Sequence, residues 1–537
     1  MKASWPRQFH AGLFALLVAS LPVCGSPSDP ATARRPKQTI GMNLSMLVGW
    51  SREWAFVDVF KHSRPWISQQ SGGGGPWDTG EEIRLTPEGW PLLNKGQAAA
   101  TLMCRGLDGH YPGGKYILSF EGRGVVATGL DAPRLVIKSS GSHPVHVKPH
   151  NGGIHLRIDQ SDPANPVRNI RLTMPGFQNA TSPFHPLFLK RLRPFKVIRF
   201  MDWQRTNNSK AVRWADRTTP GSIRQSSAQG VAVEYMIKLC NELHAAPWFC
   251  MPHLADDDFV RHFAELVRQR LDHDLTIYVE WSNEAWNGIF AQSKWARKEA
   301  SRRGLALTDV IADEARRDWD IWLDVFGPQR ERIVRVAAGQ LGDLRIAKGI
   351  LERLDGAFDA VSCAAYFGVP ADLPEATTVE DLLDAASRNI DEVVLPRLLR
   401  HARFAEQWQS RPGRPIRLVA YEAGQHIVPI KNLGKGRNDF VPWKQAAWAC
   451  QTHPKMYDVY RKLLDACRTS GMDLVMAFSN ITAQSKWGSW GHLQYQDEPL
   501  EKAPKFKALL DAIAFSHSTS QGRIQEAGSK KNGAPVD

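Results

Sequence analysis

One stretch decides the fold and points to the site: Thr276-Ile277-Tyr278-Val279-Glu280-Trp281-Ser282-Asn283-Glu284-Ala285-Trp286-Asn287. Its first four residues have the β-branched and aromatic composition of a strand. The strand ends in an Asn-Glu pair among aromatic residues, which is typical of a site rather than of a core. A carboxyl group beside tryptophan can have its pKa raised by desolvation, which suits a general acid.

A second glutamate ends another strand-like run much later in the chain. The apolar run that begins at Ile416 is followed directly by Tyr421 and Glu422. Glycoside hydrolysis uses two carboxyl groups that flank the reacting bond. Glu284 and Glu422 are therefore a candidate catalytic pair.

Size and composition exclude few classes of protein. A length of 537 residues favours several domains or one large barrel with insertions, and 43% hydrophobic and 23% charged residues are typical of a soluble globular protein. The net charge of +13 suggests nucleic-acid binding, but Lys and Arg are spread over helical segments such as 261–270 and 298–303. We interpret the charge as a solvated basic surface, with attraction to acidic glycans as a minor alternative and no nucleic-acid partner.

The N-terminus has the pattern of a secretory signal. Lys2 and Arg7 precede a short apolar run, residues 11–21, and small residues follow up to Ser26. We expect cleavage near Gly25 and a secreted or periplasmic protein without stable membrane insertion. Anchoring as a lipoprotein through Cys24 is an alternative that fits the preceding residues poorly.

The cysteine pattern leaves two possibilities open. After Cys24 the chain contains Cys104, Cys240, Cys250, Cys363, Cys450 and Cys467. An even number in an exported chain permits disulfides, and buried free thiols are the equal alternative. No CxxC spacing occurs, so a structural zinc site is not expected, and we predict neither a metal nor a cofactor.

Alternation of strands and helices predicts the fold. From about Gly72 to Pro175, Gly-rich turns separate short alternating segments, which favours a β-sandwich. After Pro186 strands and helices alternate, and counting from Thr39 gives eight strands. The expected helical segments include 291–325, 379–408 and 503–514. We therefore predict an α/β fold, a (β/α)8 TIM barrel with a β-sandwich-like domain inserted between barrel strands 1 and 2. The predicted order is a signal peptide (1–25), a linker (26–37), the barrel (38–66 and 184–516), the inserted accessory domain (67–183) and a disordered tail (517–537).

With the strands counted, the chain resembles the clan A glycoside hydrolases. These retaining enzymes are (β/α)8 barrels with an Asn-Glu acid/base ending strand four and a Glu nucleophile ending strand seven. Asn283-Glu284 ends the fourth strand of our count and Glu422 the seventh. The resemblance covers roughly residues 38–66 and 184–516 and assigns no single family. It implies a double displacement with Glu422 as nucleophile and Glu284 as proton donor, the carboxyl groups lying about 5–5.5 Å apart.

The resemblance also implies roles for residues that bind the substrate. Asn283 would contact the sugar 2-hydroxyl, and Tyr366, at the end of strand six, would orient the nucleophile. Arg199 on strand two would hold Glu422 ionised, because a nearby guanidinium lowers a carboxyl pKa. His253 after strand three would bind substrate, and a tryptophan after strand eight would form the floor of a sugar subsite. Trp487 and Trp490 are the candidates for that floor.

Several of these positions have plainer interpretations. His253 is equally well explained as a structural histidine, and Arg199 as a structural ion-pair partner. Glu280 and Trp281 fit a structural role better than a catalytic one. Some families of the clan have a histidine before the strand-six tyrosine, where this chain has Ala364. The substrate therefore stays open beyond a β-linked polysaccharide or oligosaccharide.

Two other functions compete with hydrolysis. One is a non-catalytic carbohydrate-binding protein on a barrel scaffold, and the retained pair Glu284 and Glu422 argues against it. The other is a binder of nucleic acid or another acidic polymer, which only the net charge supports. A barrel alone does not separate these functions, because the fold hosts many chemistries.

Overall fold

The computed structural model describes residues 38–370, 372–408, 415–430 and 439–529, without side chains for 517–529. The predicted signal peptide, Cys24 and the linker lie outside the described residues. Within them no helix is long and apolar enough to cross a membrane.

Eight parallel strands close into a barrel, which confirms the predicted fold. Each strand pairs with the next along the chain, and the last pairs with the first. The strands, in order, are β1 (Thr39–Asn43), β12 (Val197–Arg199), β13 (Ala246–Met251), β14 (Ile277–Trp281), β15 (Ile333–Ala338), β16 (Ala360–Phe367), β17 (Arg417–Gln425) and β18 (Leu474–Ala477).

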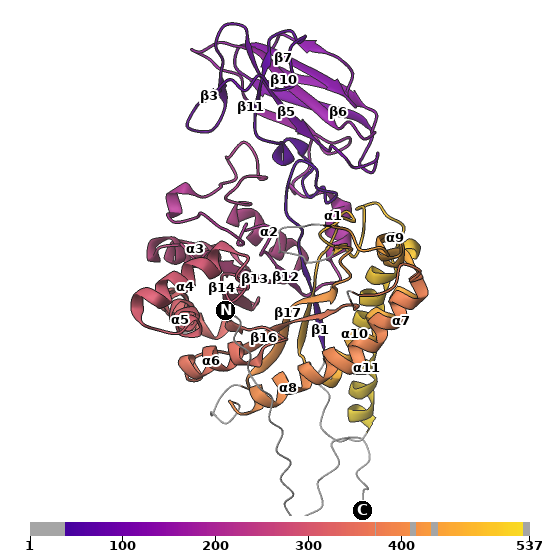
Figure 1. Ribbon diagram of the computed structural model, residues 1–537. Coiled ribbons are helices and arrows are strands. Elements are labelled where there is room, and N and C mark those ends of the chain that lie inside the picture. Colours follow the sequence, from indigo (N-terminus) through magenta and orange to yellow (C-terminus); the bar gives the residue numbers. More distant parts are fainter. Residues whose placement is uncertain (1–37, 371, 409–414, 431–438, 530–537) are drawn as a thin grey trace, which may run out of the picture. The chain divides into compact units, whose positions relative to one another are not determined.

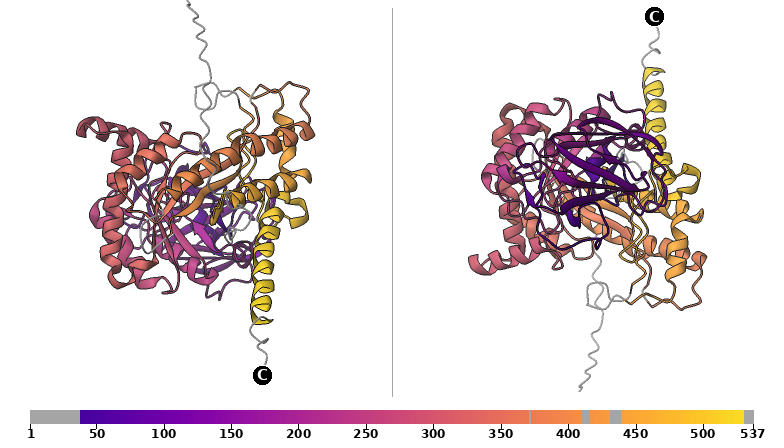
Figure 2. Two further views of the ribbon diagram at one scale, coloured as in Figure 1. Left: turned by 90° about the horizontal axis from the view of Figure 1, so that it is seen from below. Right: turned by 90° about the horizontal axis from the view of Figure 1, so that it is seen from above.

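Helices α3 to α6 and helices α7, α9, α10 and α11 lie on opposite sides of the barrel strands (Figures 1 and 2). The helices are α1 (Pro186–Leu192), α2 (Val233–Leu243), α3 (Asp257–Arg270), α4 (Ala291–Arg303), α5 (Leu307–Phe326), α6 (Leu344–Leu354), α7 (Val379–Asn389), α8 (Leu395–Glu406), α9 (Lys444–Ala449), α10 (Lys455–Thr469) and α11 (Pro504–Ser529).

The structure differs from the expected helices in three places. The segment 291–325 is two helices, because Gly304 ends α4 in a left-handed conformation with φ 67°. The segment 379–408 is also divided, by a π-helical turn between α7 and α8. Helix α11 continues over 517–529, where a disordered tail was predicted. Gln, Arg, Glu and Ala in that stretch are good helix formers, and no proline interrupts it.

Alternation along the strands divides the barrel into an inside and an outside. The inner side chains form one buried cluster: Val197, Met201, Trp248, Cys250, Tyr278, Val334, Val336, Ala360, Val419, Tyr421, Leu474 and Met476. Their neighbours along each strand, such as Ile198 and Phe249, point outward to the helices. Gly41 makes room inside, since a Cβ there would lie 2.3 Å from the Met476 sulfur. The barrel is therefore a packed core, and the polar cluster around Arg199 lies at the carboxyl ends of its strands.

Ten strands lie between β1 and β12 in the sequence. They form two main antiparallel sheets, β2-β5-β10-β7-β8 and β11-β6-β9, and a short pair, β3-β4. The inward side chains of both main sheets share one hydrophobic cluster, as in a sandwich. The strands are β2 (Ile67–Gln70), β3 (Arg84–Leu85), β4 (Pro91–Leu92), β5 (Gln97–Met103), β6 (Gly114–Glu121), β7 (Gly124–Leu130), β8 (Val136–Ile137), β9 (Gly141–Val147), β10 (Ile154–Ser161) and β11 (Arg168–Thr173).

Candidate active site

A fully buried guanidinium lies at the centre of the polar end of the barrel. Arg199 ends β12, and its Nη1 donates to Glu422 Oε1 at 3.0 Å and to Asn43 Oδ1 at 3.1 Å. Its Nη2 donates to Glu280 Oε2 and to Asn283 Oδ1, both at 2.8 Å. One side chain therefore links β1, β14, β17 and the loop after β14.

Glu422 receives the strongest donors of the site. It is 6% exposed, and besides the Arg199 contact its Oε2 accepts from the Tyr366 hydroxyl at 2.9 Å. Burial raises the pKa of Glu422, while Arg199 and Tyr366 act against that rise and Glu284 adds to it. Arg199 acts to lower the pKa of this carboxyl, but burial has the larger effect, so the pKa stays raised.

Glu284 has neutral donors only. It is partly exposed, and its Oε1 accepts from the Tyr421 hydroxyl at 3.1 Å. Its Oε2 accepts from Asn287 Nδ2 at 2.8 Å. Burial raises the pKa of Glu284, and these two hydrogen bonds only partly offset the rise. With a guanidinium on Glu422 and none bonded to Glu284, a single proton shared by the pair favours Glu284.

Irregularities in the backbone orient the side chains of both Glu422 and Glu284. The pairing of β16 with β17 shifts between Cys363 and Ala364, so that Tyr421 is the extra residue of a β-bulge. Two consecutive side chains, Tyr421 and Glu422, therefore both face the barrel interior. On the other side of the site, Glu284 adopts φ 42°, an uncommon value for a residue with a Cβ.

Asn283 is fixed by contacts on both ends of its amide. Its Oδ1 accepts from Arg199, and its Nδ2 donates to Asn207 Oδ1 at 3.1 Å. Gln292 Nε2 holds the same loop by donating to the Asn207 side chain and to the Asn283 carbonyl, both at 2.7 Å. One N–H of the Asn283 amide has no partner among the described residues and is free for a ligand.

The remaining predicted binding residues lie at different distances from the pair. Trp490 packs edge-on against Tyr366, with ring centroids 5.7 Å apart, and so borders Glu422. The Trp487 side chain is 49% exposed and contacts Lys486. His253 is buried, packs edge-on against Trp295, and has a ring Nδ1 without a hydrogen-bond partner in the described part of the chain. Trp490 thus contacts Tyr366, a hydrogen-bond partner of Glu422, whereas the described residues show no such contact for Trp487 or His253.

Sequence reasoning missed several residues of the site. Tyr421 was seen only as part of a strand, and Asn43 lies at the end of the first strand without a motif. Glu280 was not missed, since the sequence favoured a structural role for it; it accepts from Trp248 Nε1 at 2.9 Å as well as from Arg199. His426, exposed after β17, packs against Trp490 with centroids 5.1 Å apart, and its place four residues after Glu422 was the available signal.

No group of metal-ligating side chains occurs in the part of the chain that the structure describes. All six cysteines after Cys24 are buried and free, which decides between the two possibilities that the sequence left open.

No model of a protein family matches the sequence, and no curated protein matches it. Solved structures similar to the chain include the family 51 arabinofuranosidase of Xanthomonas axonopodis pv. citri, with 14% identity and a TM-score of 0.38 over 56% of this chain and 62% of that one. A family 51 α-L-arabinofuranosidase of Bifidobacterium longum has 12% identity and a TM-score of 0.41, covering 62% of this chain and 67% of its own.

A family 39 glycoside hydrolase of Bacteroides cellulosilyticus WH2 has 10% identity and a TM-score of 0.35, with coverage of 75% and 78%. These structural neighbours are clan A glycoside hydrolases, and they point to no single family. The chain spans less than two thirds of the Xanthomonas enzyme. At such identities the likeness concerns the fold alone and says nothing of activity or substrate.

Proposed function

We propose that the protein is an exported retaining glycoside hydrolase that cleaves a β-linked polysaccharide or oligosaccharide. The observation that carries the proposal is the unequal pair of carboxyl groups at the carboxyl ends of two barrel strands. Glu422 is bonded to a guanidinium and a phenol, and Glu284 to a phenol and an amide. This is the division of labour that double displacement requires.

The first step forms a covalent intermediate. The Glu422 carboxylate attacks the anomeric carbon and forms a C–O bond, while the bond to the leaving oxygen breaks. Glu284 gives its proton to that oxygen, so that the leaving group departs as an alcohol. The free N–H of Asn283 would donate to the 2-hydroxyl, a contact that strengthens in the transition state.

The second step returns the enzyme to its starting state. Glu284, now a carboxylate, takes a proton from an incoming water, and the resulting hydroxide attacks the anomeric carbon. The bond to Glu422 breaks, and the product keeps its original configuration. Tyr366 and Arg199 hold the departing carboxylate of Glu422 through the hydrogen bonds that they already make. We assign the inserted residues 67–183 as an accessory domain.

Azide rescue tests the two roles separately. Glu284→Ala should lose roughly 10²–10⁴-fold in turnover of a β-glycan. On an activated substrate azide should restore it and give a glycosyl azide of retained configuration. Glu422→Ala should lose activity to the limit of detection, and azide should give a product of inverted configuration.

Glu352→Gln, on the exposed face of α6, is the control and should keep full activity. Unchanged turnover in both alanine variants would show that the site is wrongly assigned. If the wild-type protein binds glycans from a broad panel but cuts none, it is a carbohydrate-binding protein instead.

A further inference from the structure

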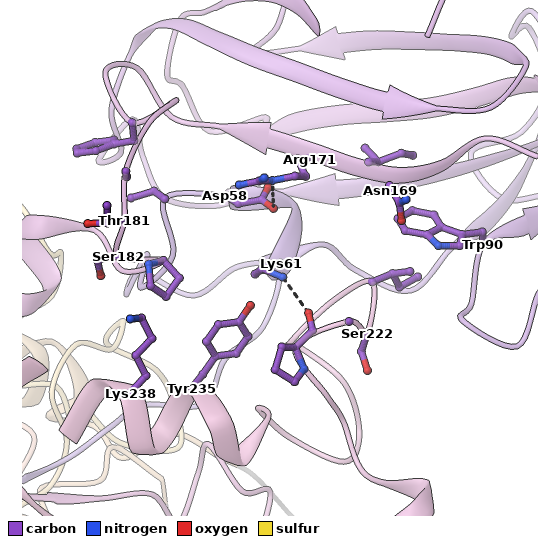
Figure 3. A pocket seen from close by; sticks show the side chains of 18 residues that line it. Asp58, Lys61, Trp90, Asn169, Arg171, Thr181, Ser182, Ser222, Tyr235 and Lys238 are labelled. Atoms are coloured by element: carbon purple, nitrogen blue, oxygen red, sulfur yellow. Dashed lines mark hydrogen bonds and ion pairs between the residues drawn. The ribbon is translucent and has the colours of Figure 1, made fainter. Parts of the chain in front are cut away.

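A cavity of about 570 Å³ lies between the inserted sheets and helix α2 of the barrel. Its upper wall in Figure 3 consists of β11 and the 3-10 helix Val59–His62, and its lower wall of α2. The segment 220–223 closes one side. None of the residues that contact Glu284 or Glu422 lines this groove.

Three cations reach the groove against one carboxylate. The Arg171 side chain is 63% exposed and lies 3.7 Å from Asp58. Lys61 donates to the carbonyl of Pro220 at 3.4 Å and has no carboxylate within ion-pair distance among the described residues. Lys238 is 3.2 Å from Glu242, which does not line the groove. The lining therefore carries an excess of positive charge, and it is partly exposed, so that an anion can reach it.

Two neutral polar side chains of the groove are also unused. The Tyr235 hydroxyl and the Asn169 amide have no hydrogen-bond partner in the described part of the chain, and Figure 3 shows Tyr235 rising from α2 into the groove. A hydroxyl and an amide both donate and accept, which suits a ligand rich in hydroxyl groups. Cation and hydroxyl donors thus face the same space from opposite walls.

Aromatic rings supply a fixed apolar surface. The Tyr235 ring packs edge-on against Phe56, with centroids 5.0 Å apart, and Lys61 lies 5.4 Å from its centroid. Trp90, which also lines the groove, is stacked on Phe60 at 6.1 Å. Rings held in this way can pack against the C–H faces of a ligand at little cost in conformational entropy.

We propose that this groove binds an acidic oligosaccharide, one whose sugar rings carry carboxylate groups. Arg171 and Lys61 would hold the carboxylates, Tyr235 and Asn169 the ring hydroxyls, and the aromatic side chains the ring faces. The volume lies within the usual range of about 300–1,000 Å³ for small-ligand sites. The proposal rests on the proposed function only in taking the ligand to be a saccharide.

The test is calorimetric titration of the full-length protein with a tetrasaccharide of galacturonic acid. Glu422→Gln is the background, so that no ligand is consumed. We expect binding that weakens in high salt, because the contacts are ionic and partly exposed. Lys61→Gln combined with Arg171→Gln should weaken it about tenfold or more, and Tyr235→Phe a fewfold.

Lys298→Gln, an exposed lysine on α4, is the matched control and should leave the affinity unchanged. Equal affinity for a neutral glucose tetrasaccharide, or no effect of the double substitution, would overturn the proposal. Tighter binding of a DNA oligonucleotide at the same residues would overturn it too, in favour of a nucleic-acid site. Inorganic sulfate that competes as strongly as the tetrasaccharide would show a simple anion site and also contradict it.

Turnover separates this proposal from the proposed function. The double variant in an otherwise wild-type chain should keep its turnover of a small activated glycoside, because neither residue contacts the catalytic pair. If the protein binds the acidic tetrasaccharide but hydrolyses no glycan, the proposal for the groove stands and the proposed hydrolase function fails. If it hydrolyses glycans but binds no acidic tetrasaccharide, the hydrolase function stands and the proposal for the groove fails.

Discussion

The surroundings of Glu422 and of Glu284 differ more than their positions in a barrel suggest. Glu422 lies on a barrel strand directly after a β-bulge, is almost fully buried, and bonds to a cation. Glu284 lies in a loop with a left-handed backbone, is partly exposed, and bonds to neutral groups. Both pKa values are raised by burial, so burial alone does not assign roles. The difference in hydrogen-bond donors assigns the roles. Each prediction below changes the surroundings of Glu422 or of Glu284.

The largest effect is expected from removing the cation. Arg199→Gln would leave Glu280 and Glu422 buried without their guanidinium, which should cost about 3–5 kcal/mol in the free energy of unfolding. Activity should be lost with it. Urea denaturation measures the change, with Arg302→Gln as control, because Arg302 pairs with Glu299 on the surface and its loss should cost much less. Equal losses in the two variants would mean that Arg199 does not neutralise the pair.

The two tyrosines should shift opposite ends of the pH profile. Tyr366→Phe removes a donor from the Glu422 carboxylate, so its pKa rises and the acid limb of kcat/KM moves to higher pH. Tyr421→Phe removes a donor from the Glu284 carboxylate, so its pKa rises and the alkaline limb moves to higher pH. Each shift should be up to about one pH unit, and kcat should fall roughly tenfold. Shifts of the same limb in both variants would contradict the assignment.

The tryptophans should differ in their effect on substrate binding. Trp490 packs against Tyr366 beside Glu422, so Trp490→Ala should lower kcat/KM by about tenfold or more, through lost contact with the sugar. Trp487→Ala should change it by less than about threefold. Steady-state kinetics on an oligosaccharide compares the two variants. A larger effect of Trp487→Ala would assign the sugar subsite to the exposed Trp487 instead of Trp490.

The smallest effect concerns stability. Because the folded-state pKa of Glu284 is raised above 4.5, the folded protein holds more protons than the unfolded chain, and stability falls as pH rises above that value. Glu284→Gln removes this loss and should stabilise the protein more at pH 8 than at pH 5. Glu422→Gln should gain less, since Arg199 would lose a partner. Thermal denaturation at the two pH values measures the stability of both variants. Equal stabilisation by the two substitutions would contradict the proposed difference between Glu284 and Glu422.

Sequence reasoning reached the parts of the site that follow from counting strands and alternating side chains. It located Glu284 and Glu422 at strand ends and Arg199 on the second strand, because order along the chain decides those features, and only the resemblance linked Arg199 to Glu422. It did not find that Tyr421 faces the same way as Glu422, since a bulge breaks the alternation and leaves no mark in composition. Nor could it bring Arg171 and Tyr235 to one groove, because that depends on how the inserted sheets pack against the barrel.

Asn43 has a consequence for the order in which the protein can be built. Its Nδ2 donates to the carbonyl of Tyr421 at 3.1 Å and to that of Ala477 at 3.3 Å, across 378 and 434 residues of sequence. The strand partners of the inserted sheets all lie within residues 67–173. During synthesis all strands of those sheets are available early, whereas the hydrogen-bond partners of Asn43 are made only with β17 and β18. The catalytic centre can therefore be completed only after β18 has been made, later than the inserted sheets, and a chain cut short before β18 leaves the barrel open.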